Sequence, residues 1–381
     1  MKTISVLGAT GSVGTQALDV ARLRGYRVDF ISAGKNEELT EALAREFRPT
    51  AVAMADPTAA AGLKLRLADT SVRVLSGEEG ILEGIASSES TTCVNSILGE
   101  AGLMPTLAVI DSGKRLALAN KESLVIAGEI VMKRAEERGC EIIPVDSEHS
   151  AIFQSLHSGK REEIKRIILT ASGGPFFGKS RAELERVTLA DTLAHPTWRM
   201  GRKITVDSAT LMNKAFEVIE AVHLFGVPSS KVQVTVHRES ILHSAVEYID
   251  NTVIGELSVP DMRMCVQYAV DYPDRCPGVA EPLDLFKVGT LTFHRPDRAT
   301  FPFLDMAERA AAAGGAMCAV MNAADEVAVE AFLAGKLSFV GIIDTVCEVF
   351  SRMSHAKDAK TLQQIILTDR EARAITRELI G

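Results

Sequence analysis

The sequence predicts an α/β protein whose first part is a doubly wound parallel sheet. An apolar stretch over residues 3–8 has the composition of a buried strand, and it leads into a glycine-rich turn and a helix-like stretch that ends near Gly25. Strand-like and helix-like stretches then alternate up to Glu148, as in a parallel sheet whose crossovers are helices. Further strands are expected at residues 27–33, 51–55, 72–75, 92–97, 116–119 and 141–145.

The glycine-rich turn has the spacing of a dinucleotide-binding loop. Gly8, Gly11 and Gly14 follow the first strand directly and open the helix. Glycines at this spacing allow a pyrophosphate to approach the backbone at the helix N-terminus, where free amide groups favour an anion. The spacing alone is a weak signal, but its place between an apolar strand and a helix makes it specific. The sequence therefore predicts a Rossmann-type domain at the N-terminus.

The end of the second strand favours NADP over NAD. Folds selective for NAD usually end this strand with an acid that binds the ribose 2′-hydroxyl. Here Gly34, Lys35 and Asn36 follow the strand, and the first acid is Glu37. Lys35 and Asn36 can instead accept a 2′-phosphate, so we expect NADPH as the cofactor.

The pattern changes after Glu148. Strand-like stretches at residues 166–170, 231–237, 240–248 and 253–259 predict a central α+β domain with an open sheet, and helix-like stretches at 303–313, 317–334, 340–353 and 362–379 predict a C-terminal helical bundle. We expect an NADPH-binding domain at residues 1–147, a catalytic domain at 148–283, a linker at 284–300 and a helical domain at 301–381.

Composition narrows the class of protein. The net charge of −8 argues against nucleic acid as a partner, and no apolar run approaches the length of a membrane span. The 6 cysteines are scattered without a CxxC pair, which favours reduced thiols over a disulfide framework or a zinc site. Met1 leads almost at once into a strand, leaving no room for a signal peptide. We therefore expect a soluble, cytoplasmic protein.

Two segments carry the residue types of a metal- and phosphate-binding site. Residues 142–145 are predicted to be a strand that continues through Asp146 and Glu148, whose carboxylates then point to the same side of an extended backbone. Residues 208–217 are predicted to begin a helix that places Asn213, Lys214 and Glu217 on one face. Three carboxylates suit Mg²⁺ or Mn²⁺, and the lysine, asparagine and serine side chains suit a phosphate.

Other polar residues are candidates by position. Lys121 follows the sixth strand, at the carboxyl edge of the sheet where ligands bind, although residues 120–123 could also be a solvated helix start. His195 could bind a phosphate or be an ordinary loop histidine. Trp198 lies in a loop bounded by proline and glycine, which suits a lid. His149 could ligate a metal, but three carboxylates do not require it.

These motifs resemble the 1-deoxy-D-xylulose-5-phosphate reductoisomerase family over essentially the whole chain. The matching segments are the glycine loop and residues 33–36, 119–124, 144–149, 172–176, 195–201, 206–214 and 260–263. The resemblance implies the rearrangement, by retroaldol and realdol steps, and the NADPH-dependent reduction of 1-deoxy-D-xylulose 5-phosphate to 2-C-methyl-D-erythritol 4-phosphate, in the non-mevalonate (MEP) pathway of isoprenoid synthesis. It also implies a homodimer.

The family's roles transfer to matching positions. The divalent metal would be bound by Asp146, Glu148 and Glu217, and the reacting carbon skeleton would be contacted by Lys121, Ser147 and Glu148. The substrate phosphate would be held by Ser172, His195, Ser208, Asn213 and Lys214. NADPH would be bound by Thr10, Gly11, Ser12, Val13, Gly34, Lys35, Asn36, Asn120, Glu122 and Gly201. The closing loop would carry Trp198 and Met200.

The chain also departs from the family's pattern, and other classes of protein remain to be weighed. Arg238-Glu239 stands where the family often has Pro-Gln, and Met264-Cys265 and Glu100 are unusual, but none of these is an implied ligand. Other two-domain NADP enzymes, such as semialdehyde or homoserine dehydrogenases, do not account for the three acids. A non-catalytic nucleotide-sensing protein would be expected to lack an acid or the lysine, whereas the set is complete here.

Overall fold

The computed structural model describes residues 2–198 and 200–381. The chain forms two units made of discontinuous segments. Unit 1 comprises Met1–Ser123, Val131–Ser150 and Asp261–Pro282, and unit 2 comprises Leu124–Ile130, Ala151–Pro260 and Leu283–Gly381. The proposed division into three consecutive domains stays a prediction.

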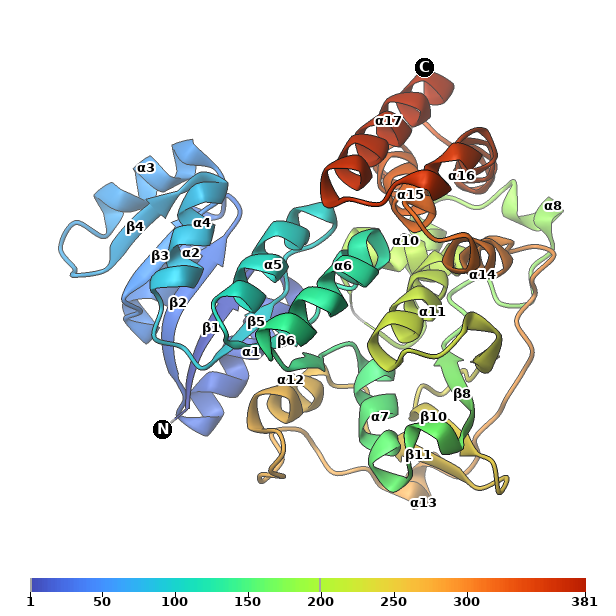
Figure 1. Ribbon diagram of the computed structural model, residues 1–381, viewed down its shortest axis with the longest axis horizontal. Helices are drawn as coiled ribbons and strands as arrows, with labels where there is room; N and C mark the ends of the chain where they lie inside the picture. The colour runs from blue at the N-terminus through green and yellow to red at the C-terminus, as the bar shows by residue number, and fades with distance from the viewer. Residues whose placement is uncertain (1, 199) are drawn as a thin grey trace. The chain divides into compact units, whose positions relative to one another are not determined.

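Unit 1 is built on a parallel sheet in the order β4-β3-β2-β1-β5-β6-β7, which confirms the predicted doubly wound fold. Figure 1 shows β1 to β4 side by side in blue. Nearly continuous apolar runs form these strands because parallel strands are covered on both faces. The strands are β1 Thr3–Leu7, β2 Arg27–Ala33, β3 Ala51–Met54, β4 Arg73–Ser76, β5 Thr92–Asn95, β6 Arg115–Leu118 and β7 Ile142–Pro144.

Local signals in the sequence fix the ends of the helices of unit 1. Asn36 and Asp56 accept hydrogen bonds from the first backbone amides of α2 and α3, and Gly25 ends α1 in a left-handed conformation (φ 67°). The helices are α1 Ser12–Arg24, α2 Glu37–Phe47, α3 Pro57–Arg66, α4 Gly77–Ser87, α5 Leu103–Asp111 and α12 Met262–Asp271. Two more, α6 Glu122–Arg138 and α7 Ser147–Ser155, contain residues of both units.

Unit 2 contains a mixed sheet in the order β11-β10-β8-β9, in which only β8 and β9 are parallel. The strands are β8 Ile164–Ala171, β9 Val232–Val236, β10 Leu242–Tyr248 and β11 Val253–Leu257. The helices before the linker are α8 Arg181–Leu184, α9 Leu189–Leu193, α10 Arg202–Thr210 and α11 Met212–Phe225. The expected open sheet and the expected strands at its core are confirmed.

The C-terminal helices form the predicted helical part of unit 2. Helix α15 packs against both α16 and α17, which Figure 1 shows in orange and red. Their shared core includes the fully buried side chains of Val320, Ile342 and Ala372. The helices of this part are α13 Leu285–Val288, α14 Phe303–Ala313, α15 Met317–Leu333, α16 Phe339–Arg352 and α17 Leu362–Ile380.

Two local predictions were wrong. The last strand of the parallel sheet ends at Pro144 and α7 begins at Ser147, so Glu148 lies in the first turn of a helix rather than on an extended strand. The segment 208–217 is not one helix: α10 ends at Thr210, Leu211 has a left-handed backbone (φ 60°), and α11 starts at Met212.

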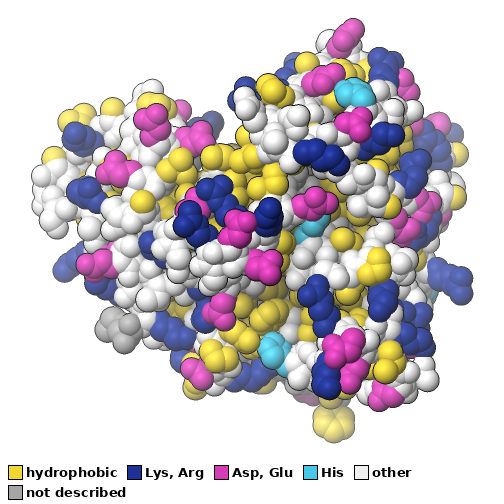
Figure 2. Space-filling view, in the orientation of Figure 1, with side chains coloured by type: hydrophobic (Ala, Val, Ile, Leu, Met, Phe, Trp, Pro, Cys, Tyr) yellow, Lys and Arg dark blue, Asp and Glu magenta, His cyan; other side chains and the backbone are white. Residues whose placement is uncertain are grey.

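The cysteines are free, as their spacing predicts, and charges of both signs are mixed on the visible surface (Figure 2). All 6 cysteines are free, and burial raises the pKa of Cys93 and of Cys318 to about 12, which keeps these thiols unreactive. Figure 2 shows lysine and arginine side chains interspersed with aspartate and glutamate over the visible face. Within residues 2–198 and 200–381, no helix is both long and apolar enough to cross a bilayer.

Candidate active site

The glycine loop of unit 1 lies at the point where the strand order reverses, between β1 and β5. Open parallel sheets bind ligands at this switch point. Gly8 has a left-handed backbone (φ 76°), and a Cβ there would lie 2.8 Å from the carbonyl oxygen of Ser96. A Cβ on Gly14 would lie 2.1 Å from the carbonyl oxygen of Gly8, so both positions require glycine. Gly11 begins α1 without a side-chain cap, which leaves first-turn amides for an anion.

The residues after β2 fit a 2′-phosphate better than a 2′-hydroxyl. Gly34, Lys35 and Asn36 are exposed, and Asn36 Oδ1 accepts the backbone N–H of Leu39 at 3.1 Å. The Lys35 ammonium has no ion-pair partner among the described residues. The first acid, Glu37, is instead paired with Arg66 at 3.4 Å.

Asn120 holds the loop that follows β5. Its Nδ2 donates to the carbonyl oxygen of Ile97 at 2.7 Å and to the Glu122 carboxylate at 3.0 Å, while its Oδ1 accepts the backbone N–H of Ser123 at 3.1 Å. The side chain is 2% exposed. Asn120 therefore shapes one wall of the switch point, and direct binding of NADPH by Asn120 and Glu122 stays a prediction.

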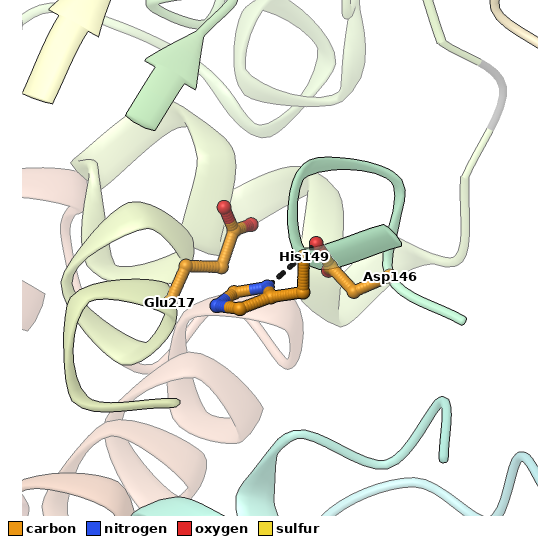
Figure 3. A group of neighbouring side chains, drawn as sticks. All are labelled: Asp146, His149 and Glu217. Carbon is orange, nitrogen blue, oxygen red and sulfur yellow. Dashed lines mark hydrogen bonds and ion pairs between the residues drawn. The ribbon is translucent and has the colours of Figure 1, made fainter. Parts of the chain in front are cut away.

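Asp146 is the centre of the polar group at the start of α7. Its Oδ1 accepts the backbone N–H of Glu148 at 3.2 Å and lies 3.1 Å from Nδ1 of His149 (Figure 3). Its Oδ2 accepts a hydrogen bond from Lys121 Nζ at 2.6 Å, in an ion pair whose side chains are 7% and 11% exposed. The Ser147 hydroxyl donates to the Glu148 carboxylate. Asp146 is thus oriented by a helix start, an imidazole and an ammonium group.

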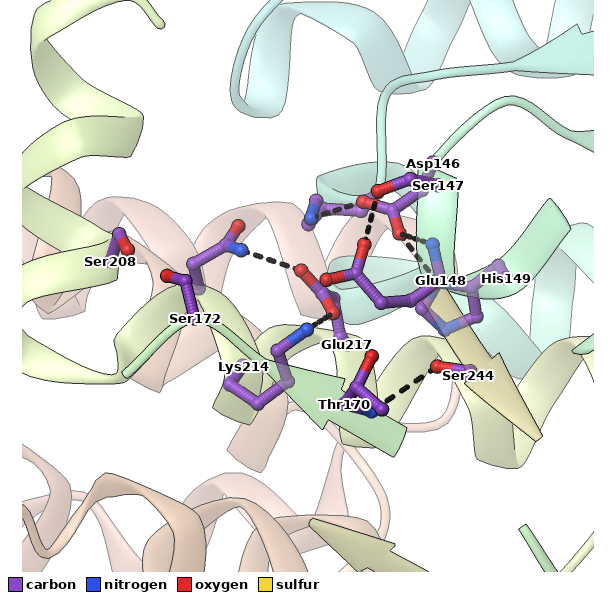
Figure 4. Close-up of polar contacts among 12 residues, drawn as sticks. Asp146, Ser147, Glu148, His149, Thr170, Ser172, Ser208, Lys214, Glu217 and Ser244 are labelled. Atoms are coloured by element: carbon purple, nitrogen blue, oxygen red, sulfur yellow. Dashed lines mark hydrogen bonds and ion pairs between the residues drawn. The ribbon is translucent and has the colours of Figure 1, made fainter. Parts of the chain in front are cut away.

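Glu217 is the predicted metal-binding acid that lies in unit 2. It is 1% exposed on α11, where it accepts hydrogen bonds from Asn213 Nδ2 at 2.5 Å and from Lys214 Nζ. The predicted spacing on one helical face is therefore confirmed for these three residues. Figure 4 shows Lys214 pointing to Glu217 within unit 2. The group offers one hard oxygen ligand and two donors that suit an anion.

His195 joins two serine hydroxyls that are far apart in sequence. Its Nε2 lies 3.0 Å from Ser172 Oγ and 3.1 Å from Ser208 Oγ. Its Nδ1 accepts the backbone N–H groups of Thr197 and Trp198 at 3.2 and 2.9 Å, so the neutral ring carries its proton on Nε2.

The protonation of His195 decides what the two hydroxyls can do. Burial is the main cause that lowers its pKa to about 4, so the ring is neutral at pH 7. Because Nε2–H then donates to the serine oxygens, the hydroxyl protons of Ser172 and Ser208 can be donated to an anion. These hydroxyls suit an anion such as a phosphate, and His195 orients them; we call the three residues the phosphate-type cluster, and their binding of the substrate phosphate stays a prediction.

The loop that carries Trp198 leads into α10. The indole and the imidazole of the buried His243 have ring centroids 6.1 Å apart, and Trp198 and Met200 are both half-buried. Gly201 caps the N-terminus of α10 in an extended conformation (φ −61°, ψ 158°). The lid role of this loop and the contact of Gly201 with NADPH stay predictions.

Sequence reasoning assigned no function to two residues that the structure joins to the site. His149 was set aside as an unneeded ligand, although its position three residues after Asp146 in a helix could have indicated their hydrogen bond. Arg238 was noted only as a departure from the family pattern, and its hydrogen bonds to the backbone of Ser172 and Gly174 have no local sequence signal.

Comparisons with known proteins cover the chain from end to end. Residues 4–128 match a family model described as 1-deoxy-D-xylulose 5-phosphate reductoisomerase, and residues 142–225 and 257–375 match two models of its C-terminal domains. A reductoisomerase of this name from Symbiobacterium thermophilum is 49% identical, covering 99% of this chain and 98% of the relative. One from Geobacter sp. is 45% identical, covering 100% and 99%.

Solved structures show the same similarity. A 1-deoxy-D-xylulose 5-phosphate reductoisomerase from Zymomonas mobilis in complex with NADPH is 40% identical with a TM-score of 0.92, over 100% of this chain and 99% of that one. A reductoisomerase in complex with NADPH, fosmidomycin and magnesium is 37% identical with a TM-score of 0.94, over 100% and 98%.

Fold, site and similarity together define the class of protein. Unit 1 carries a glycine loop at the switch point of its parallel sheet, and both units carry largely buried acids paired with lysines. These features are typical of an α/β oxidoreductase with a dinucleotide-binding domain. Within that class, the chain belongs to the 1-deoxy-D-xylulose 5-phosphate reductoisomerase family.

Proposed function

We propose that this chain converts 1-deoxy-D-xylulose 5-phosphate to 2-C-methyl-D-erythritol 4-phosphate, a step of the non-mevalonate pathway of isoprenoid synthesis. The observation that carries the proposal is the full-length match to this family, at 49% identity over 99% of the chain. NADPH and Mg²⁺ or Mn²⁺ are its cofactors. When bound, NADPH supplies the hydride and the metal ion polarises neighbouring carbonyl and hydroxyl oxygens of the sugar.

The residues of unit 1 fit NADPH. The switch-point loop requires glycine at Gly8 and Gly14, and the uncapped start of α1 suits the pyrophosphate. Lys35 suits the 2′-phosphate because its ammonium is exposed and Glu37 is paired elsewhere. The proposed NADPH ligands in this unit are Thr10, Gly11, Ser12, Val13, Gly34, Lys35, Asn36, Asn120 and Glu122, and Gly201 of unit 2 is a further proposed ligand.

The donor set fits a hard divalent cation. Asp146, Glu148 and Glu217 offer carboxylate oxygens, which Mg²⁺ and Mn²⁺ prefer. His149 orients Asp146 through a hydrogen bond of 3.1 Å, in the way that a neighbouring group orients a metal ligand. Lys121 balances the charge of Asp146 and Lys214 that of Glu217, so each acid is held in place by an ion pair.

The phosphate of the substrate is bound by the hydroxyls of Ser172 and Ser208, with Asn213 and Lys214 as further donors. Neutral His195 fixes both hydroxyls so that their protons are donated outward. Lys121, Ser147 and Glu148 contact the carbon skeleton, where Lys121 can hold or release a proton at a substrate oxygen. Trp198 and Met200 close over the substrate and exclude water from its reactive intermediates.

Turnover of the purified chain tests this function. We expect oxidation of NADPH that depends on both 1-deoxy-D-xylulose 5-phosphate and Mn²⁺, with 2-C-methyl-D-erythritol 4-phosphate as the product identified by mass spectrometry. NADPH oxidation that needs no sugar phosphate, or a different product, would rule out the proposal.

Cofactor choice gives a separate prediction. Wild-type protein is expected to have a clearly higher kcat/KM with NADPH than with NADH, because Lys35 can pair with the 2′-phosphate. Lys35→Glu should narrow this difference, since a carboxylate repels the phosphate and accepts the 2′-hydroxyl of NADH. Lys64→Glu, at an exposed position of α3, is the control for the change of charge. Equal kcat/KM values for the two cofactors in wild-type protein would contradict the assignment of Lys35.

The assembly and the location of the chain are also proposals. We propose a homodimer in the cytoplasm, in keeping with the family resemblance and the free cysteines. Sedimentation of the purified chain at micromolar concentration measures the first of these directly.

A further inference from the structure

Arg238 binds the backbone of the segment that carries Ser172, one of the two serines of the phosphate-type cluster. Its Nη1 donates hydrogen bonds to the carbonyl oxygens of Ser172 at 2.7 Å and of Gly174 at 2.6 Å. Its guanidinium also lies over the ring of Phe177, 5.2 Å from the centroid. Two carbonyls and an aromatic face fix this side chain in one place.

The segment that Arg238 holds is closely packed and has an unusual backbone conformation. Gly173 and Gly174 are both in the left-handed region, with φ of 76° and 65°. A Cβ on Gly174 would lie 2.6 Å from the carbonyl oxygen of Ser208, so the segment is pressed against the end of α10. The relative position of the Ser172 and Ser208 hydroxyls therefore depends on how residues 172–174 are held.

The hydroxyl of Ser172 is arranged as a donor. Its oxygen accepts the backbone N–H of Gly174 at 3.3 Å and faces the Nε2–H of neutral His195 at 3.0 Å. Because these two contacts use both lone pairs, the hydroxyl can act toward a further partner only as a donor. Rotation of the 172–174 backbone would break the hydrogen bond from the Gly174 N–H and would move the Ser172 hydroxyl away from His195.

Arg238 also supplies charge. Its hydrogen-bond partners are neutral carbonyls, and within the described part of the chain it forms no ion pair. The neighbouring carboxylate of Glu239 is engaged by the Thr292 hydroxyl at 2.7 Å. The field of Arg238 reaches the cluster, because after burial its charge is the next cause that lowers the pKa of His195. Positive potential at this place favours a phosphate dianion.

We propose that Arg238 is a positioning residue of the phosphate site: it fixes residues 172–174 so that Ser172 donates to the substrate phosphate, and it adds positive potential without touching that phosphate. The identity of the substrate in this inference rests on the proposed function, whereas the anion site is inferred from the contacts of these residues alone.

Substitution of Arg238 by methionine and by lysine tests the proposal. Arg238→Met should raise KM for 1-deoxy-D-xylulose 5-phosphate by about tenfold or more, with a smaller change in kcat, because a lost charged hydrogen bond is expressed in binding. Arg238→Lys keeps the charge but cannot reproduce the planar guanidinium, so its KM should lie between the values of wild-type protein and of Arg238→Met. Arg186→Met is the matched control: this arginine lines the same pocket of about 660 Å³ as Arg238, but its exposed side chain has no partner among the described residues.

Inorganic phosphate separates this role from general structural damage. The dissociation constant of phosphate, followed by NMR of the histidine ring signals, should rise in Arg238→Met in parallel with KM, while NADPH affinity stays at the wild-type value. If Arg238→Met does not fold, the same comparison is made with Arg238→Lys. Wild-type phosphate affinity in the folded variants would overturn the proposal, and so would an equal loss of NADPH affinity. If wild-type protein does not turn over the sugar phosphate, the proposed function fails, while the phosphate measurement still decides the role of Arg238.

Discussion

Replacement of Lys203 by methionine is expected to lower the free energy of unfolding by about 3–5 kcal/mol, the usual cost of removing one partner from a buried ion pair. Lys203 Nζ lies 2.6 Å from Asp207 Oδ2 and 2.8 Å from Asp325 Oδ2. The two aspartate side chains are only 4% and 0% exposed. One ammonium group thus balances two buried acids, one on α10 and the other on α15. Without it, both carboxylates would have to stay buried against their own repulsion.

This loss of stability should depend on pH. Burial is the main cause that raises the pKa of Asp325 above its usual value, while the charge of Lys203 opposes that rise. An acid whose pKa is raised by folding takes up a proton as the chain folds, so its contribution to stability improves as pH falls through the folded-state pKa. Removal of Lys203 should raise the pKa of Asp325 further, because the positive charge that opposes the rise is lost. The difference between wild type and Lys203→Met should therefore be larger at pH 8 than at pH 5.

Urea unfolding at the two pH values measures both effects. Lys336→Met is the matched control, because Lys336 is exposed and has no ion-pair partner among the described residues. Its unfolding free energy should equal that of the wild type at either pH. A Lys203→Met protein of wild-type stability, or a difference that grows on acidification, would show that the two aspartates do not depend on Lys203.

The parallel sheet of unit 1 could be predicted from sequence because its signals are local. Buried parallel strands are short apolar runs, and the glycines at Gly8 and Gly14 are required by contacts with the neighbouring backbone. The same holds for the face of α11, where helical spacing alone places Asn213 and Lys214 beside Glu217.

The remaining features depend on contacts that a local pattern does not contain. Nothing in the sequence marks the left-handed backbone of Leu211, which is neither glycine nor asparagine and which separates α10 from α11. The end of β7 was placed too late because an aspartate after an apolar run can either end a strand or cap a helix. Here Asp146 caps α7. The hydrogen bonds from His195 to Ser172 and Ser208 join three segments, so no local pattern predicts them, and only the family resemblance had grouped these residues.

The largest effect on catalysis is expected from the acids. We predict that Asp146→Asn or Glu217→Gln lowers kcat by about a hundredfold or more, because each removes a carboxylate ligand of a metal ion that acts directly on the charge of the transition state. Chelation should likewise abolish turnover, and Mn²⁺ or Mg²⁺ should restore it. NADPH binding, followed by its fluorescence, should persist in the metal-free protein, since its proposed ligands exclude these acids.

The contacts of the two acids strengthen this expectation and separate it from simple loss of structure. Asp146 is paired with Lys121 and Glu217 with Lys214, so each amide variant removes a metal ligand and also the negative charge of an ion pair. Glu185→Gln, at an exposed position of unit 2, is the control and should keep the wild-type rate. Because a metal ligand and a mere ion-pair partner differ in their dependence on the ion, the decisive measurement is the concentration of Mn²⁺ that gives half-maximal turnover. It should rise in both variants; an unchanged value, or full turnover of wild-type protein in chelator, would exclude the metal site.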